Sequence, residues 1–528
     1  MVGNSVEGNG HYITVWAPRQ AGKTWVMQEV VEQLRTSGEF EVGIITMQDA
    51  KEDKSDESVL ETFVQELNNW FDRDFPDVTE WKQVKSLFTA DYFSKPVILV
   101  IDEFDALAEV FINRFANAFR AMYTTRSNQR HLPSDEKSNL LHGLALIGVR
   151  SVLGIENVSG SPFNVQRSVY IPNLTEDEVH TLFHSYEQES GQRIAPNVIT
   201  RIYREMRGQP GLTCWMGELL TETYNKHQSV ITIRDFNRAY ALALKALPNN
   251  NILNIISKAK METYQPFVLE MFKTDEKLLF RYDDPDTNYL YMNGVVAHEV
   301  VVPVASAHML EEELDDEIES ELGFYFEDAG EEEELYLKFP SPFVQRRLFN
   351  YFSHQLFGGL DNLYDPDTDL SKTITLTFLN VPNVMRIYED YVQKNSAWLF
   401  RNAPRRKTDD RIYEAVYHFN LFAYLAKFLR PFKASLVPEF PTGNGKVDLI
   451  IRHNKRLYPL ELKSYANLQQ RQEAVEQAAA YGQTLKVSEV WLIFFIESIT
   501  DERRAELEVT VTDAATGVVV YQVFVRMG

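Results

Sequence analysis

The first third of the chain alternates predicted strands and helices. "HYITVWAPRQAGKTWVMQEVVEQL" (11–34) has the pattern of a strand, a loop and an amphipathic helix. "KPVILVIDEFDAL" (95–107) is apolar up to its acidic end, which is typical of a strand buried on both faces of a parallel sheet. A third strand, "LALIGVR" (144–150), follows. This order predicts an α/β domain with a parallel sheet over residues 1–168.

The last quarter of the chain has a different order of elements. Its centre, "GKVDLIIRHNKRLYPLELK" (445–463), alternates apolar and polar residues around a short polar turn, which predicts a β-hairpin. An amphipathic helix (409–429) and the strand "ASLVPE" (434–439) precede it, and a helix (467–485) and the strand "EVWLIFFI" (489–496) follow. The sequence therefore predicts a second α/β domain over residues 401–528.

Length and composition favour several packed domains. The chain has 528 residues, too many for one hydrophobic core, and 44% of them are apolar. Its one cysteine, Cys214, excludes an intramolecular disulfide and any cysteine-rich metal site, which suits a reducing cytoplasm. No apolar run approaches the length of a membrane span, and no signal peptide precedes the first motif. We therefore expect a soluble, cytoplasmic, multidomain α/β protein.

The distribution of charge matters more than its total. The net charge of −23 argues against nucleic acid as a partner, but an acidic run at 311–334 carries much of the excess. Residues 401–463 instead hold thirteen lysines and arginines and six aspartates and glutamates. A basic region within an acidic chain predicts contact with a phosphate backbone. The alternative is a solvated face.

The loop after the first strand has the residues of a phosphate-binding loop. Gly22, Lys23 and Thr24 open the predicted helix, where free N–H groups and the helix dipole favour phosphate. The first glycine of the usual pattern is replaced by Ala17. We expect Lys23 to reach the β- and γ-phosphates and Thr24 to ligate Mg²⁺. The predicted nucleotide-binding residues are Arg19, Gln20, Ala21, Gly22, Lys23, Thr24, Trp25 and, from the second strand, Asp102.

Two acids end the second strand, at the edge where parallel sheets bind ligands. We expect Asp102 to bind within the coordination shell of Mg²⁺ and Glu103 to polarise the attacking water. The alternative is a buried strand that ends in two solvated acids. Arg150 and Ser151, at the end of the third strand, are candidates to sense the γ-phosphate or have a structural role.

The register of the predicted hairpin brings two carboxylates together. A two-residue turn at Asn454 and Lys455 suits asparagine, which tolerates positive φ, and it sets Asp448 opposite Glu461. Directly opposed residues have Cβ atoms about 4.5–5.5 Å apart, so two carboxylates there repel each other unless a cation lies between them. Lys463 points to the same face as Glu461. This pattern predicts a Mg²⁺ site for phosphodiester hydrolysis, in which Lys463 orients the water.

Four segments occur in the order seen in the AAA-like ATPase family, part of the STAND/Orc-like P-loop group. They are "APRQAGKT", "VILVIDEFDAL", "SPFNVQRSVYIPNLTEDEV" (161–179) and "MRGQPGLTCWMGELLTE" (206–222). The resemblance covers residues 11–245 and implies ATP as ligand, a P-loop ATPase core at 1–168, a helical lid at 169–247 and homo-oligomers formed through the ATPase domain. It makes Arg207 a sensor candidate. The chain starts almost at the first strand, without the family's adenine-contacting segment, which leaves base specificity open.

The middle of the chain resembles domains that accompany this ATPase. Residues 248–356 resemble a winged-helix domain with an acidic insertion at 309–334 in place of the wing. The insertion is expected to be a solvating loop. The alternative is a DNA mimic that covers the basic face of the last domain. Residues 357–400 resemble the connector found ahead of a nuclease.

The last domain resembles the PD-(D/E)XK nuclease superfamily, whose fold is restriction-endonuclease-like. The resemblance rests on the α-β-β-β-α-β order and on the motif E-x(8)-D-x(12)-E-x-K. A lone D…ExK motif is weak, but the hairpin register, both helices and the basic surroundings agree with it. The resemblance implies a catalytic core of Asp448, Glu461 and Lys463, with Glu439 and Glu414 as supporting acids and Gln477 and Tyr481 facing the site from the following helix.

Together these patterns predict an ATP-regulated, Mg²⁺-dependent nuclease, with Mn²⁺ as a substitute metal. DNA is favoured over RNA as substrate, and fusions of this kind suggest genome defence or mobile elements by analogy alone. One alternative is a regulatory NTP-binding scaffold whose nuclease fold binds nucleic acid or protein without cutting. Another is an ATPase that remodels a protein.

Overall fold

The chain forms two compact units in the computed structural model. The structure describes residues 10–148, 167–272, 278–301, 334–406, 412–439, 448–464 and 468–527. One unit contains Met1–Ala239 and Tyr282–Gly294, and the other contains Tyr240–Arg281 and Val295–Gly528. Within the described residues, no helix is long and apolar enough to cross a membrane.

A five-stranded parallel sheet forms the centre of the first unit, in the order β2-β3-β4-β1-β5. This confirms the predicted α/β fold with a parallel sheet. The strands are β1 (Tyr12–Trp16), β2 (Glu41–Thr46), β3 (Val97–Asp102), β4 (Leu141–Gly148) and β5 (Arg167–Tyr170).

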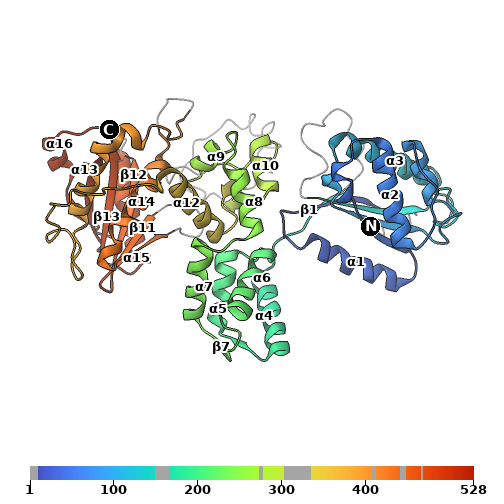
Figure 1. Cartoon of the computed structure of the whole chain (residues 1–528), viewed down its shortest axis with the longest axis horizontal. Helices are drawn as coiled ribbons and strands as arrows, with labels where there is room; N and C mark the ends of the chain where they lie inside the picture. The colour runs from blue at the N-terminus through green and yellow to red at the C-terminus, as the bar shows by residue number, and fades with distance from the viewer. Residues whose placement is uncertain are drawn as a thin grey trace, which may run out of the picture. The chain divides into compact units, whose positions relative to one another are not determined.

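Helices cover both faces of this sheet (Figure 1). On one face, Met27 and Val31 of α1 pack on Ile98 and Ile147. On the other, α2 and α3 share a core with alternate residues of the same strands, such as Leu99. Two covered faces explain why β3 and β4 are apolar almost throughout. The helices are α1 (Lys23–Ser37), α2 (Asp56–Phe71) and α3 (Glu109–Asn128), with short 3₁₀ turns at Asp49–Glu52, Trp81–Phe88 and Phe104–Ala106.

A helical subdomain follows β5, and the predicted lid boundaries of 169–247 stay a prediction. Its helices are α4 (Glu176–Ser190), α5 (Pro196–Met206), α6 (Pro210–Glu218) with a π-helical turn at Leu219–Thr223, and α7 (Ile233–Lys245), and a short parallel pair joins β6 (Arg193–Ile194) to β7 (Val230–Ile231). Thr175 caps α4 through a reciprocal pair of bonds with Glu178. One further helix, α10 (Pro285–Met292), belongs to the first unit although it comes later in the chain.

The second unit begins with helices and one antiparallel strand pair. These elements are α8 (Asn250–Ala259), α9 (Gln265–Glu270), β8 (Ala297–Val301), β9 (Glu334–Lys338) and α12 (Pro342–Phe357). The acidic insertion predicted at 309–334 falls almost wholly outside the described residues. Its roles as solvating loop or DNA mimic therefore stay predictions, and so does the winged-helix resemblance.

A six-stranded mixed sheet forms the C-terminal part of the second unit, in the order β10-β11-β12-β13-β15-β14. The predicted sequence of helix, strand, hairpin, helix and strand is present. The strands are β10 (Ser435–Glu439), β11 (Asp448–His453), β12 (Arg456–Ser464), β13 (Glu489–Ile496), β14 (Thr510–Thr512) and β15 (Val519–Arg526). The helices are α13 (Val381–Leu399), α14 (Glu414–Phe428), α15 (Leu468–Thr484) and α16 (Asp501–Leu507), with a 3₁₀ turn at Arg430–Phe432.

The two faces of this sheet pack against different helices. Ala474 and Ala478 of α15 share a core with Leu492 and Phe494 of β13. Phe495 points to the opposite face, where it contacts Tyr417 and His418 of α14. The sheet is therefore sandwiched between α15 and α14.

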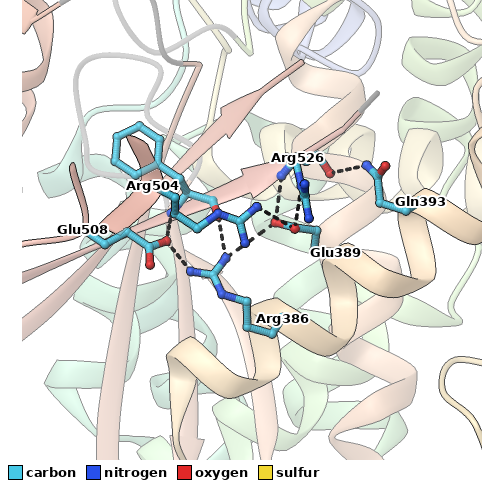
Figure 2. Close-up of polar contacts among 7 residues, drawn as sticks. Arg386, Glu389, Gln393, Arg504, Glu508 and Arg526 are labelled. Atoms are coloured by element: carbon cyan, nitrogen blue, oxygen red, sulfur yellow. Dashed lines mark hydrogen bonds and ion pairs between the residues drawn. The ribbon is translucent and has the colours of Figure 1, made fainter. Parts of the chain in front are cut away.

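Helix α13, which the sequence placed in a connector, is held to the C-terminal sheet by buried charges (Figure 2). Glu389 is 2% exposed, and its Oε1 accepts bonds from Arg504 Nη2 at 2.7 Å and Arg526 Nε at 2.9 Å. Its Oε2 accepts from the backbone N–H of Arg526 at 2.9 Å. Arg386 bonds Glu508 and the carbonyl of Phe524. We call this group the Glu389 network.

Candidate functional site

The loop between β1 and α1 has the backbone shape needed to surround an anion. Gly22 adopts φ +84°, a left-handed conformation that glycine takes without steric cost, and α1 begins at the next residue. Gln20 also has positive φ, at +56°. Lys23 Nζ donates to the carbonyls of Ala17 at 3.0 Å and Pro18 at 3.1 Å. The predicted phosphate loop thus curls around its own lysine at the N-terminus of a helix.

Residues from two strands meet beside this loop. Thr24 Oγ1 donates to Asp102 Oδ2 at 2.6 Å, although the two residues are 78 positions apart. Asp102 Oδ1 accepts from the backbone N–H of Glu103 at 2.8 Å. Hydroxyl and carboxylate oxygens are ligands that Mg²⁺ takes in proteins, so this pair fits the predicted metal.

Burial and neighbouring charges shift the pKa values of ionisable side chains next to the loop. Burial raises the pKa of the Glu103 carboxyl, and the negative charges of Asp105 and Asp102 raise it further. Burial lowers the pKa of the Lys23 ammonium, against the attraction of the same three acids, of which Asp105 acts most strongly. Asp105 is absent from the predicted residues, although "DEFDAL" shows it two positions after Glu103. A carboxyl with a raised pKa suits a role as proton acceptor.

The helical subdomain bonds directly to the phosphate loop. Gln209 Nε2 donates to the carbonyls of Arg19 and Gln20, both at 3.1 Å, and the backbone N–H of Gly211 donates to Gln20 at 3.0 Å. A Cβ on Gly211 would lie 2.6 Å from the side chain of Gln20, so a larger residue here would force Gln20 to move. Gln209 was not predicted, although its place before Pro210 marks it as the N-cap of α6.

The other residues that were predicted to contact nucleotide differ in their exposure and in their distance along the chain from the loop. Arg207 ends α5 in a left-handed conformation, and its carbonyl accepts a bond from Asn173. Trp25 is 79% exposed on α1, and Ala21 is buried in the loop. Arg150 and Ser151 lie outside the described residues.

The structure confirms the register of the predicted hairpin. Asn454 and Lys455 form its turn with φ of +45° and +66°. The pairs run from His453 with Arg456 to Leu449 with Leu460. One further step of the same register would set Asp448 opposite Glu461, so this pairing stays a prediction. On its other side Asp448 pairs with Glu439 of β10, which gathers three acidic positions across neighbouring strands.

Two of the predicted catalytic residues form a buried pair. Glu461 is fully buried and Lys463 is 3% exposed, with 3.7 Å between Oε1 and Nζ. Glu461 pairs with Leu492 in the parallel register and Lys463 with Phe494. Both therefore lie on the sheet face that α15 covers. Charged side chains are rarely buried without a partner or a function.

Glu414 approaches the end of β12 from α14. Its Oε1 accepts a bond from the backbone N–H of Ser464, directly after Lys463, at 3.2 Å. It also lies 3.6 Å from Nε2 of His418, a fully buried histidine that was not predicted. The spacing of four residues on one helix was the available signal for His418.

The remaining predicted residues are less fully described. Gln477 is exposed and Tyr481 half-buried, beside the row of α15 residues that faces the sheet. The side chains of Glu439 and Asp448 lie outside the description, although their backbones are placed. Among the side chains that are described, no three histidines, cysteines, aspartates or glutamates gather closely enough to hold a metal ion.

Comparison with known proteins identifies the class of the first unit. Residues 2–239 match the family model described as "AAA-like domain". This part of the chain is therefore similar to AAA-like domains, and its parallel sheet agrees with that similarity. The match ends before α8 and covers none of the C-terminal sheet. No curated protein matches the chain.

Several solved structures are similar to the chain at low identity. The ORC1 protein of Aeropyrum pernix in complex with DNA is 15% identical, covers 64% of this chain and 86% of its own, and has a TM-score of 0.30. The Walker-type ATPase paby2304 of Pyrococcus abyssi is 12% identical, with 66% and 96% covered and a TM-score of 0.38. The ORC2 protein of Aeropyrum pernix is 12% identical, with 56% and 83% covered and a TM-score of 0.35. No functional conclusion follows from similarities this low.

Proposed function

We propose that the protein is an ATP-regulated, Mg²⁺-dependent nuclease that hydrolyses phosphodiester bonds of DNA or RNA. The observation that supports the nuclease assignment is the hairpin register of Leu449 with Leu460, which, continued by one position, would set Asp448 opposite the buried Glu461. Lys463 lies on the same sheet face as Glu461. DNA is the favoured substrate, and homo-oligomers form through the ATPase domain. The positive charge of residues 401–463 supports binding of a nucleic-acid backbone.

In the AAA-like domain, the described contacts support nucleotide binding and hydrolysis. Lys23 and the backbone of Gly22–Thr24 hold the phosphates, and Thr24 and Asp102 hold Mg²⁺. Glu103 orients the attacking water and accepts its proton, a role that its raised pKa supports. Gln209 joins the loop to α6, which gives the lid a direct response to nucleotide.

In the C-terminal domain, Asp448 and Glu461 hold Mg²⁺, which when bound neutralises charge on the phosphate. Lys463 orients the attacking water and offsets the charge that develops on the phosphate oxygens. A P–O bond forms to this water as the bond to the leaving sugar oxygen breaks, and a proton passes to that oxygen. Glu414, Glu439 and Gln477 support this site from α14, β10 and α15.

Cleavage assays on the full-length protein test this proposal. Wild type is incubated with single- and double-stranded DNA and RNA, with Mg²⁺ or Mn²⁺, with and without ATP. In protein that remains folded, Lys463→Ala and the isosteric Glu461→Gln should each lower cleavage by about 100- to 1,000-fold and leave nucleic-acid binding intact. Lys455→Ala, at the exposed turn of the same hairpin, should cleave like wild type. If wild type cuts no substrate under any condition, the scaffold alternative replaces the nuclease.

A further inference from the structure

Four aromatic rings from three segments of the first unit meet at the carboxyl ends of β1 and β5. Trp16 and Tyr170 end these strands as a register pair, with ring centroids 4.6 Å apart. Tyr291 of α10 lies 5.7 Å from Trp16 and 6.3 Å from Tyr170. Tyr282, just before α10, lies 6.4 Å from Trp16 and 6.3 Å from Tyr291. We call these four residues the ring cluster.

The ring cluster adjoins the phosphate loop. Trp16 directly precedes Ala17, whose carbonyl accepts a bond from Lys23. Gly294, three residues after Tyr291, approaches the loop so closely that a Cβ on it would lie 3.1 Å from the Cβ of Pro18. The cluster is therefore a neighbour of the loop through β1 and also through the segment that carries α10.

The ring cluster is only partly buried. Trp16 is 6% exposed, whereas Tyr170 and Tyr282 are 39% and 44% exposed. The tyrosines also bring hydroxyl groups to the cluster, and those of Tyr170 and Tyr291 are hydrogen-bonded to each other. Rings that served packing alone would gain most by leaving water completely. A buried tryptophan with exposed tyrosines around it instead has the composition of a small-molecule site, where apolar surface is combined with a few polar groups.

We propose that the ring cluster binds the base of the nucleotide whose phosphates lie on the loop. This inference rests on the proposed nucleotide binding. Stacking of a base on an aromatic side chain contributes about 1–3 kcal/mol, and tyrosine hydroxyls can bond the polar edge of a base. The base site is thus completed by residues more than 250 positions downstream of the phosphate loop.

Calorimetric titration with Mg²⁺–ATP and with Mg²⁺–tripolyphosphate separates the base from the phosphates. Full-length wild type should bind ATP more tightly than tripolyphosphate. Tyr170→Ala and Tyr282→Ala should each lower the affinity for ATP about tenfold and leave the affinity for tripolyphosphate unchanged. Tyr282→Phe, which keeps the ring and loses only the hydroxyl, should lose much less affinity for ATP than Tyr282→Ala. Tyr224→Ala is the matched control, because Tyr224 is 39% exposed and follows the π-helical turn of the lid.

Three results would overturn the inference. The first is an equal loss for both ligands, which would mean that the rings only support the loop. The second is an unchanged affinity for ATP in both alanine variants. The third is a wild type that binds ATP no more tightly than tripolyphosphate. A wild type that binds neither ligand would instead refute the proposed nucleotide binding, and this inference with it.

Discussion

The phosphate loop of the first unit and the buried acids of the second unit hold their charged side chains in opposite ways. In the first unit, Lys23 bonds carbonyls of its own loop, and Asp102 bonds a hydroxyl on the surface. In the second unit, Glu389 and Glu461 are buried, and each lies within ion-pair distance of a basic side chain. A charge on a loop is available to a ligand and adds little to the core. A buried charge supports the fold that presents it, so its loss affects stability as well as chemistry.

The largest effect that we expect from a substitution is on the stability of the second unit. Glu389→Ala would leave Arg504 and Arg526 without their carboxylate, and we expect a loss of about 3–5 kcal/mol in the free energy of unfolding. Denaturant titration of the C-terminal transition measures this change. Glu476→Ala, on the exposed face of α15, is the control and should have almost no effect. A loss below about 1 kcal/mol for Glu389→Ala would contradict the comparison.

The second prediction concerns the loop, where binding and stability should separate. Lys23→Ala removes a charged donor from the phosphates, and hydrogen bonds to charged groups contribute about 1.5–3 kcal/mol each. We expect affinity for ATP to fall about 100-fold at an unchanged unfolding temperature. Calorimetric titration and thermal unfolding test the two parts, with the exposed Lys51→Ala as control. A loss of stability equal to that of Glu389→Ala would remove the contrast between the units.

A smaller effect is expected where the lid meets the loop. Gln209→Ala removes two neutral hydrogen bonds to the carbonyls of Arg19 and Gln20. We expect affinity for ATP to fall about fivefold, because such bonds contribute about 1 kcal/mol. Gln188→Ala, exposed on α4, is the control. Equal affinities in the two variants would show that this contact does not position the loop.

The smallest expected effect is a shift in the pH dependence of ATP hydrolysis. Glu103 must be ionised to accept a proton, and its pKa is raised by burial, Asp105 and Asp102. Activity should therefore be lost as the pH falls through this raised value, at a higher pH than for an ordinary glutamate. Asp105→Asn removes one raising charge and should move the acid limb to lower pH. A profile of rate against pH for both proteins decides this, and an unmoved limb would exclude Glu103 as the titrating group.

Local patterns in the sequence predicted several elements and one register correctly. Asn454 at a two-residue turn fixes the pairing of β11 with β12, because alternation has period two and a slip of one residue would turn Leu460 outward. The apolar run before Asp102 likewise marked a strand covered on both faces. Both features depend only on neighbours along the chain.

Contacts between distant segments could not be read from such patterns. Gln209 lies 190 positions from Arg19, and nothing in its own neighbourhood indicates which carbonyls it bonds. In the sequence Glu389 is an ordinary acidic residue of a helix, and only the folded chain brings Arg504 and Arg526 to its carboxylate. The same holds for Tyr282 and Tyr291, whose partner Trp16 lies at the other end of the unit's sequence.

The order in which the chain builds its two units has a practical consequence. The chain passes between the units three times, after Ala239, after Arg281 and after Gly294. A fragment that stops at residue 239, where the family match ends, would keep the phosphate loop but lack two of the four rings. Limited proteolysis between residues 240 and 281 would yield two pieces that are joined by packing rather than by a covalent link. Helix α10 of the second piece packs in the first unit, and Tyr240 and Ala243 of the first piece bond to α12 in the second unit.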